Sequence, residues 1–301
     1  MSAAASVIIP TRNRKEMLRR AIASAMMQDL PVEIIVLDDG STDGTDAMMA
    51  AEFPHVRYER SATPVGPSVL RNRGATLATT EYLLPIDDDA EFMSPATVRQ
   101  TIGDFDHPRI AAVGIPYINV RVSPEVQQRP PDRDGTWIAS AYVGAAHALR
   151  REPFLKVGGY REHLFYMGEE SDVCIRLLAA GYVTRLGRAE PPMHHHESPL
   201  RDSVRADLFA RRNDVLFGWH NVPAIDLPLR WVRTVAGAAR HSWRRGRMLR
   251  MTRGLAWGFA SVPKFFTKRS PVPRQIYLLQ RELLRRGAVP LGEIEPKLPA
   301  L

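Results

Sequence analysis

The chain has 301 residues, 45% hydrophobic and 25% charged, which is ordinary for a globular protein. Its single cysteine, Cys174, excludes an intramolecular disulfide, and no stretch reaches the roughly 20 apolar residues of a membrane-spanning helix. The net charge of +8 is uneven, because residues 201–301 carry 20 Lys and Arg against 7 Asp and Glu. With no signal-like N-terminus, these features predict a cytoplasmic protein, or one held peripherally at the inner face of the cell membrane.

The first hundred residues alternate between short apolar runs and helical patterns. Asn13 and Glu16 have the spacing of a capping box that would begin the first helix. Alternating strands and helices predict an α/β fold with a Rossmann-like, mostly parallel sheet flanked by helices. The expected strands cover residues 6–10, 32–37, 56–58 and 81–86, and the expected helices cover residues 14–25, 45–53 and 68–78.

Acidic turns follow two of these strands, at Asp38-Asp39 and at Asp87-Asp88-Asp89. Ligands of parallel sheets bind outside the carboxyl ends of the strands, so both turns are expected to reach one cleft. Adjacent carboxylates repel one another unless a cation lies between them. A divalent cation such as Mg²⁺ or Mn²⁺, carrying a phosphate-bearing substrate, is the natural occupant. The alternative is a solvated acidic turn.

Two common phosphate-binding motifs are absent. Residues 10–14 follow the first strand, where a dinucleotide-binding protein would have a glycine-rich turn, and no Walker loop occurs anywhere in the chain. Further along, residues 110–115 are an expected strand, residues 121–135 an expected loop, and residues 171–180 an expected helix.

The segment from residue 229 to 269 combines apolar residues at helical spacing with many arginines. Leu229, Val232, Ala236, Ala239 and Trp243 form the apolar series. Such a helix is typical of proteins that bind an anionic membrane surface. Nucleic-acid-binding motifs are absent, so no nucleic-acid partner is expected. The alternatives are that this segment packs on the body of the protein or forms a homo-oligomer interface.

Five segments, in chain order, resemble motifs of the family-two inverting glycosyltransferases. They are residues 6–14, 38–45, 71–74, 87–89 and 168–172. The resemblance implies a GT-A fold that binds a nucleotide-diphospho-sugar and inverts the anomeric carbon. It divides the chain into a catalytic domain, residues 1–200, and a helical basic C-terminal extension, residues 201–301. Within the catalytic domain, residues 1–115 would bind the nucleotide-sugar and residues 116–200 the acceptor.

The donor side is expected to contain a base pocket. Asp39 would accept a hydrogen bond from the N–H of a uracil- or thymine-type base, and Pro10, Thr11 and Arg14 would frame the pocket. The alternative for Asp39 is a purely structural role as the cap of its turn. Arg71 matches the family position for contacting phosphate oxygens, for which a guanidinium is well suited.

The metal site is expected at the aspartate triplet. Asp89 is the expected ligand, and Asp87 a supporting contact to the donor. Asp88 is placed with the donor-binding residues, but it should contribute least if an extended backbone turns it to the opposite face. In the resembled family, a histidine three residues before a serine can complete the metal site, which indicates His195 among three consecutive histidines.

On the acceptor side, Glu170 stands where the family usually has an aspartate, and it is the expected base. Glu169 is the alternative, because the longer glutamate side chain moves the carboxylate. The helix N-terminus is expected to keep this carboxylate ionised. The donor would be a UDP-, dTDP- or GDP-linked hexose or deoxyhexose, and the acceptor a glycan or a lipid-linked molecule, in cell-surface polysaccharide or glycolipid synthesis.

Two other functions remain open from the sequence. A sugar-phosphate nucleotidyltransferase would share the sheet and the carboxylates, but it would need a glycine- and arginine-rich phosphate loop that residues 10–14 do not supply. A non-enzymatic, membrane-associated scaffold would also suit the basic C-terminal segment.

Overall fold

The computed structural model describes residues 2–196, 203–243 and 247–301, with the side chains of residues 241–243 left out of the description. Its strands are β1 (Ala5–Thr11), β2 (Val32–Asp38), β3 (Arg57–Arg60), β4 (Tyr82–Pro85), β5 (Ala90–Glu91), β6 (Ile110–Gly114), β7 (Tyr117–Asn119), β8 (Val126–Gln127), β9 (Trp137–Ala139), β10 (His147–Arg150), β11 (Val183–Leu186), β12 (Met193–His195) and β13 (Val289–Pro290).

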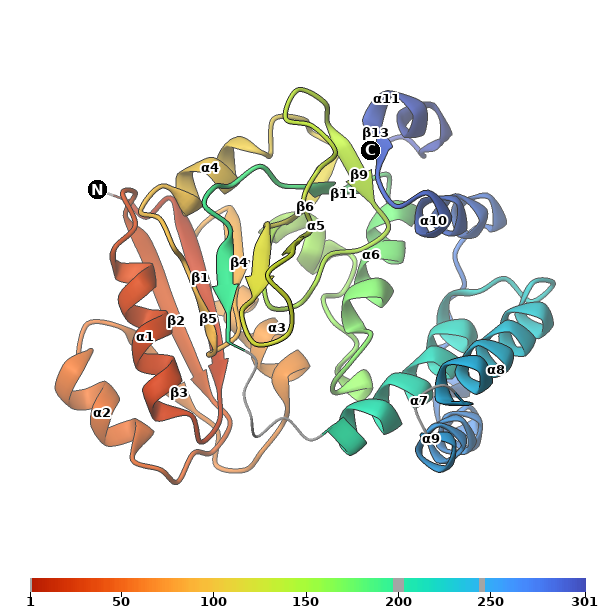
Figure 1. The fold of residues 1–301 in the computed structure, drawn as a ribbon, viewed down its shortest axis with the longest axis horizontal. Helices are drawn as coiled ribbons and strands as arrows, with labels where there is room; N and C mark the ends of the chain where they lie inside the picture. The colour runs from red at the N-terminus through yellow and green to blue at the C-terminus, as the bar shows by residue number, and fades with distance from the viewer. Residues whose placement is uncertain (1, 197–202, 244–246) are drawn as a thin grey trace.

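Helices lie on both faces of the sheet and form most of the C-terminal third (Figure 1). They are α1 (Lys15–Met26), α2 (Thr45–Glu52), α3 (Pro67–Leu77), α4 (Thr97–Gly103), α5 (Arg151–Lys156), α6 (Glu169–Ala179), α7 (Ser203–Asn221), α8 (Leu227–Trp243), α9 (Met248–Ser261), α10 (Arg274–Arg286) and α11 (Leu291–Ile294), with short 3₁₀ segments η1 (Glu162–Leu164), η2 (Pro263–Lys268) and η3 (Glu295–Lys297).

The described residues form a central sheet in the order β13-β9-β11-β6-β10-β4-β1-β2-β3. Strands β4, β1, β2 and β3 run parallel, as the alternating pattern predicts. Beyond them the sheet is mixed, because β10, β9 and β13 each pair antiparallel with their neighbours. A smaller sheet in the order β5-β12-β7-β8 lies beside the carboxyl end of β4.

Strand β1 is buried on both faces. Val7 and Ile9 pack with Leu18 and other residues of α1, whereas Ile8 packs in a second cluster with Leu70 of α3. This division follows from the alternation of side chains along a strand. A Cβ at Gly74 of α3 would overlap the Ile8 side chain, so glycine lets α3 lie close to the sheet. This packing places the carboxyl end of β1 at the cleft described below.

The predicted capping box at the start of α1 is wrong. Asn13 has a φ of +55°, and its Oδ1 accepts a hydrogen bond from the Thr42 amide at 2.7 Å. The first helical amide, that of Lys15, donates instead to the Asp43 carboxylate at 3.0 Å. Glu16 pairs with an arginine of its own helix. The cap therefore comes from the β2–α2 turn, because that turn lies beside the β1–α1 turn in the parallel sheet.

The C-terminal segment is helical over most of its length, but its end returns to the central sheet. Val289 and Pro290 pair with β9, and Ile276, Leu279 and Leu283 of α10 are buried in the main core. Figure 1 shows α10 and α11 beside β9, with α7, α8 and α9 gathered into a separate bundle. The division at residue 200 remains a proposal. Among the described residues, no helix has the length and apolar character needed to cross a membrane.

Candidate active site

One cleft of about 580 Å³ lies at the carboxyl ends of β1, β2 and β4, between them and the start of α6. Parallel strands bring these ends together although they are far apart in the sequence. Every site residue predicted from the sequence lines this cleft, namely Pro10, Thr11, Arg14, Asp39, Arg71, Asp87, Asp88, Asp89, Glu169, Glu170 and His195.

The aspartate triplet forms a turn rather than an extended segment. The Ala90 amide donates to the Asp87 carbonyl at 3.0 Å, and all three carboxylate residues line the cleft. The expectation that Asp88 faces away is therefore wrong, since side chains alternate only while the backbone stays extended. Asp88 is 4% exposed and accepts hydrogen bonds from Thr11 Oγ1 and Arg14 Nη1, both at 2.8 Å.

Arg14 is the positive charge that these adjacent carboxylates require. Its guanidinium bonds Asp88 and lies 3.3 Å from Asp89 Oδ2. Burial nevertheless raises the pKa of Asp88 to about 6, with the neighbouring Asp89 adding to the rise. Thr11 and Arg14, predicted to frame the base, thus hold the acidic turn in this structure.

His195 reaches the triplet through the register of the small sheet. Strand β12 pairs antiparallel with β5, which places His195 opposite Ala90, and the His196 amide donates to the Asp89 carbonyl at 2.7 Å. His195 Nε2 then lies 3.1 Å from Asp89 Oδ1 and 4.0 Å from Asp87 Oδ2. Only the central histidine of the three is directed at the triplet, as strand alternation predicts.

These three residues have the donor set of a divalent-cation site. One ligand atom from each of Asp87, Asp89 and His195 lies within 4.8 Å of the others. Carboxylate oxygens suit Mg²⁺ and Mn²⁺, and an added imidazole is well tolerated by Mn²⁺. The residues present therefore fit the cation predicted from the sequence.

The two aspartates of the first acidic turn, Asp38 and Asp39, have different partners. Asp38 is fully buried and accepts hydrogen bonds from the Ser41 amide (2.8 Å), the Ser41 hydroxyl (2.6 Å) and the Tyr58 hydroxyl (2.6 Å). Asp39 lines the cleft, and its carboxylate accepts from the amides of Val65 (2.6 Å) and Gly66 (3.2 Å). Asp38 thus shapes the turn, while Asp39 ties the start of α3 to the cleft.

Arg71 links the aspartate triplet to the start of α6. This residue is 5% exposed, with Nη2 at 2.5 Å from Asp87 Oδ1 and Nη1 at 3.4 Å from Glu169 Oε1. Burial alone would lower the pKa of its guanidinium, but the carboxylates around it outweigh burial and raise that pKa above its ordinary value. Arg73, two residues further along α3, is exposed and pairs with Glu59 instead.

Glu169 and Glu170 begin α6, directly after Gly168 with its φ of +90°. Glu169 is 2% exposed and is held by Arg71, whereas Glu170 is half-buried against the backbone of Gly144. A Cβ at Gly144 would overlap the Glu170 carboxylate. Burial raises the pKa of both carboxyls. The helix N-terminus, expected to favour the ionised base, therefore does not lower the pKa of either carboxyl, because desolvation is the larger effect here.

Several lining residues were not predicted. Residues 142–145 come from the loop before β10, residues 165–167 precede α6, and Arg205 comes from α7. Arg205 falls in the segment expected to be a separate extension, and its guanidinium lies over the Phe165 ring, 5.2 Å from the centroid. Neither loop carries a sequence pattern that indicates a binding site. Their place in the cleft follows from the three-dimensional fold.

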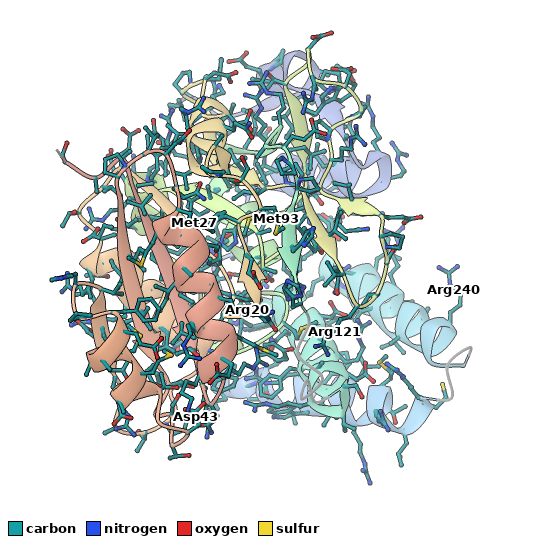
Figure 2. All side chains as sticks on the ribbon, turned by 60° about the vertical axis from the view of Figure 1, so that its left-hand side comes forward. Arg20, Met27, Asp43, Met93, Arg121 and Arg240 are labelled. Carbon is teal, nitrogen blue, oxygen red and sulfur yellow. The ribbon has the colours of Figure 1, made fainter. Side chains whose placement is uncertain are left out.

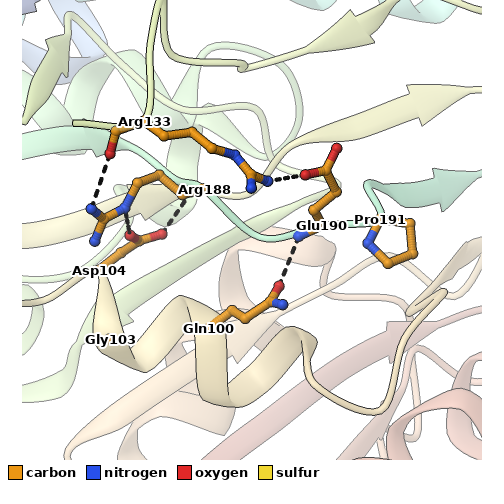
Figure 3. Close-up of a pocket in the computed structure, with 7 residues that line it drawn as sticks. All are labelled: Gln100, Gly103, Asp104, Arg133, Arg188, Glu190 and Pro191. Atoms are coloured by element: carbon orange, nitrogen blue, oxygen red, sulfur yellow. Dashed lines mark hydrogen bonds and ion pairs between the residues drawn. The ribbon is translucent and has the colours of Figure 1, made fainter. Parts of the chain in front are cut away.

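A second hollow, of about 660 Å³, contains none of the predicted residues (Figure 3). Its arginines are engaged with neighbouring acids: Arg188 Nε bonds Asp104 at 2.8 Å, and Arg133 pairs with Glu190. Among the described residues, the one group of carboxylates and histidine with the spacing of a metal site lies in the first cleft, not in this hollow.

Comparison with known proteins points to one enzyme family. The model of the family described as glycosyl transferase family 2 matches residues 6–161, just over half of the chain. The pre-mycofactocin glycosyltransferase of Mycobacterium tuberculosis is 27% identical over 225 residues, which cover 68% of this chain and 45% of that protein. A Campylobacter jejuni protein, the GalNAc(5)-diNAcBac-PP-undecaprenol beta-1,3-glucosyltransferase, is 36% identical over 96 residues, covering 30% of this chain and 31% of its own. The chain spans less than half the length of these relatives.

Solved structures show the same fold. A mannosyltransferase from Pyrobaculum calidifontis, in complex with GDP-Man and Mn²⁺, superposes with a TM-score of 0.58 at 18% identity, covering 95% of this chain and 80% of that one. S. aureus TarS 1–349 in complex with UDP-GlcNAc gives a TM-score of 0.56 at 16% identity, covering 71% and 66%. The large mixed sheet flanked by helices is the GT-A fold of such enzymes, and the chain belongs to glycosyl transferase family 2.

Proposed function

We propose that this protein is a metal-dependent, inverting glycosyltransferase that moves a hexosyl or deoxyhexosyl unit from a nucleotide-diphospho-sugar to a hydroxyl of a glycan or lipid-linked acceptor. The proposed process is cell-surface polysaccharide or glycolipid synthesis. One observation carries the proposal: the ligand atoms of Asp87, Asp89 and His195 converge in the cleft that also holds Glu170. Family membership supports the reaction class.

On the donor side, Asp89 and His195 would hold Mg²⁺ or Mn²⁺, with Asp87 beside them. A bound cation neutralises the charge that develops on a departing nucleoside diphosphate. Arg71 would bind phosphate oxygens, and Asp39 the base, as proposed from the sequence. The mannosyltransferase with GDP-Man and Mn²⁺, and TarS with UDP-GlcNAc, support this kind of donor. UDP-, dTDP- and GDP-sugars all remain candidates.

On the acceptor side, Glu170 is the proposed base. Glu169 is nearly inaccessible and bonds Arg71, so it fits a positioning role better than proton transfer. Glu170 would accept the proton of the acceptor hydroxyl while the oxygen attacks the anomeric carbon. The bond from that carbon to the diphosphate breaks as the new bond forms, so one displacement inverts the configuration.

The test is a turnover assay over a panel of UDP-, dTDP- and GDP-sugars, with membrane-lipid and glycan extracts as acceptors and Mn²⁺ present. Removing the base in Glu170→Gln should lower turnover about 10²- to 10⁴-fold and leave donor binding intact. Asp89→Asn should lose both turnover and Mn²⁺ binding. Glu52→Gln, an exposed surface change, is the control. Full turnover of the wild-type protein in excess chelator would exclude the metal role.

We also propose that α8 and α9 bind the cytoplasmic face of an anionic membrane. Leu229, Val232, Ala236 and Ala239 are all exposed on α8, so these four residues of the predicted apolar series are not buried within the described part of the chain. Arg233 and Arg240 are exposed on the same helix, and Figure 2 shows Arg240 extending away from the body. Trp243 of the series has no described side chain, and residues 244–246 lie outside the described residues.

Vesicle sedimentation tests this surface. Vesicles containing phosphatidylglycerol should capture the protein, whereas phosphatidylcholine vesicles should not, because the arginines require anionic headgroups. Replacing both Leu229 and Val232 by Asp should abolish capture. Met27→Asp, which alters an exposed apolar residue at the end of α1, should not. Equal capture of both variants would contradict the proposal, and a dimer lost on the α8 substitutions would point to the oligomer interface instead.

A further inference from the structure

The loop that leads into Glu169 and Glu170 has an unusual backbone. Phe165 has φ +65° and ψ −57°, and the Tyr166 amide donates to the Leu164 carbonyl at 2.8 Å. These values define a γ-turn of the form that is rare and strained for residues with a side chain. Met167, two residues on, has φ +70°. Two departures of this kind so close together persist only when surrounding groups hold them in place.

The group that holds this loop comes from α7. Asn213 is 3% exposed, and its Nδ2 donates to the carbonyls of Leu164 (2.8 Å), Tyr166 (2.9 Å) and Met167 (2.7 Å). An amide has two N–H groups, so at least one of them is shared between carbonyls. The carbonyls of the turn thus converge on a single buried donor.

Arg212 fixes the orientation of that amide. Its Nη1 donates to Asn213 Oδ1 at 2.8 Å and to the His163 carbonyl at 3.0 Å. The amide oxygen therefore faces the guanidinium and the amide nitrogen faces the loop. Because Arg212 also bonds the carbonyl of His163, just before Leu164, Arg212 and Asn213 together hold both the start and the end of the loop.

The loop touches both sides of the cleft. Tyr166 and Met167 line it, and Gly168 joins them directly to Glu169. The Phe165 ring lies over Gly66, whose amide donates to Asp39 on the donor side. A shift of this loop would therefore displace the proposed base relative to the donor.

We propose that Asn213 is a positioning residue of the active site, whose amide holds the 164–168 loop in the shape that presents Glu170 to the acceptor. Helix α7, which the sequence places in a C-terminal extension, then completes the catalytic machinery. The kinetic consequence rests on the proposed transferase function, whereas the effect on the loop does not.

The experiment compares wild-type, Asn213→Ala and Asn213→Ser full-length proteins. Hydrogen–deuterium exchange should be faster at residues 165–168 in Asn213→Ala and intermediate in Asn213→Ser, which retains one donor. The kcat of sugar transfer should fall about 10- to 100-fold in Asn213→Ala, because the base is misplaced. The KM for the donor should change by less than about twofold, since the metal site is untouched.

Trp219→Phe is the matched control, because it removes another α7 donor, the Trp219 Nε1 bond of 3.1 Å to the Phe265 carbonyl, within the helical bundle. This variant should not change exchange at residues 165–168 or kcat. Unchanged exchange and kcat in Asn213→Ala would overturn the proposal, as would equal effects of the Trp219 and Asn213 variants. If the wild-type protein transfers no sugar from any donor, the proposed function fails, and the exchange result alone decides the role of Asn213.

Discussion

Gly66 contacts two segments of the cleft, the Asp39 carboxylate and the Phe165 ring. Its φ is +95°, and a Cβ there would overlap the Phe165 ring that lies against it. Its amide and that of Val65 donate to the Asp39 carboxylate. A side chain at this position would therefore strain the backbone and push the 164–168 loop away from Asp39.

Gly66→Ala is expected to lower the free energy of unfolding by about 2–4 kcal/mol, from backbone strain together with overpacking. Gly44→Ala is the control, because Gly44 also has a positive φ, of +84°, but a Cβ there would have only the end of a lysine side chain within 4 Å. That change should cost about 1–2 kcal/mol. Urea denaturation measures both, and an equal loss in the two variants would argue against the contact with Phe165.

The pH dependence of turnover tests Glu170. A base must be ionised, so activity should rise with pH through the pKa of its carboxyl. Burial raises that pKa above the ordinary value of 4.5, so the acidic limb of kcat/KM should lie at a pH higher than 4.5. A limb at or below 4.5, measured at constant ionic strength with saturating Mn²⁺, would show that this carboxyl is not the buried base.

At the scale of elements, the convergence of strand ends is predictable, and the detailed contacts are not. Alternating strand and helix patterns place both acidic turns at one edge of the sheet, and the position of His195 three residues before a serine, as in the resembled family, selects it from its neighbours. The turn at residues 87–90 is not predictable, because its partners Thr11 and Arg14 lie more than 70 residues away. The cap of α1 by Asp43 is missed for the same reason: a local pattern contains no information about a neighbouring turn.

The contact between η1 and α7 predicts a pH-dependent stability. His163 Nε2 and His220 Nε2 lie 2.8 Å apart, and burial lowers the pKa of His163 to about 3 and that of His220 to about 4. The unfolded chain, with an ordinary His pKa of 6.5, binds more protons than the folded one below that pH. The part of the free energy of unfolding that depends on these two neutral histidines is therefore fully present above about pH 6.5. It declines as the pH falls towards 4.

Between pH 7.5 and pH 5, the free energy of unfolding should drop by on the order of 2 kcal/mol from His220, which is fully buried. Urea denaturation at the two pH values measures this difference. His220→Gln should reduce the difference, and His55→Gln, at an exposed position, should leave it unchanged. A pH dependence that is identical in all three proteins would contradict the role of the pair.

At the scale of the whole molecule, the C-terminal end of the chain packs back onto the central sheet. Val289, Leu291 and Ile294 are buried, the Leu291 amide donates to the Thr136 carbonyl at 2.8 Å, and Arg109 bonds the Pro299 carbonyl at 2.8 Å. The sequence does not predict this return. A two-residue strand has no periodicity to recognise, and its partner β9 lies some 150 residues earlier.

Deleting residues 288–301 should therefore destabilise the body and not merely shorten a tail. Burial of the three apolar side chains contributes about 5 kcal/mol or more, and their loss also exposes the edge of β9. We expect a lower melting temperature and aggregation, measured by calorimetry and light scattering. A truncated protein that melts at the wild-type temperature would mean that the segment does not stabilise the body.

Binding of a nucleotide-sugar in this cleft should depend on a divalent cation. Isothermal titration of UDP-, dTDP- and GDP-sugars, each with and without Mn²⁺, reports on the cleft without requiring a known acceptor. We expect that at least one donor binds in Mn²⁺, that binding weakens at least about tenfold in chelator, and that Asp89→Asn abolishes the difference. Binding of no nucleotide-sugar in Mn²⁺, or equal binding by the wild-type protein with and without the metal, would contradict it.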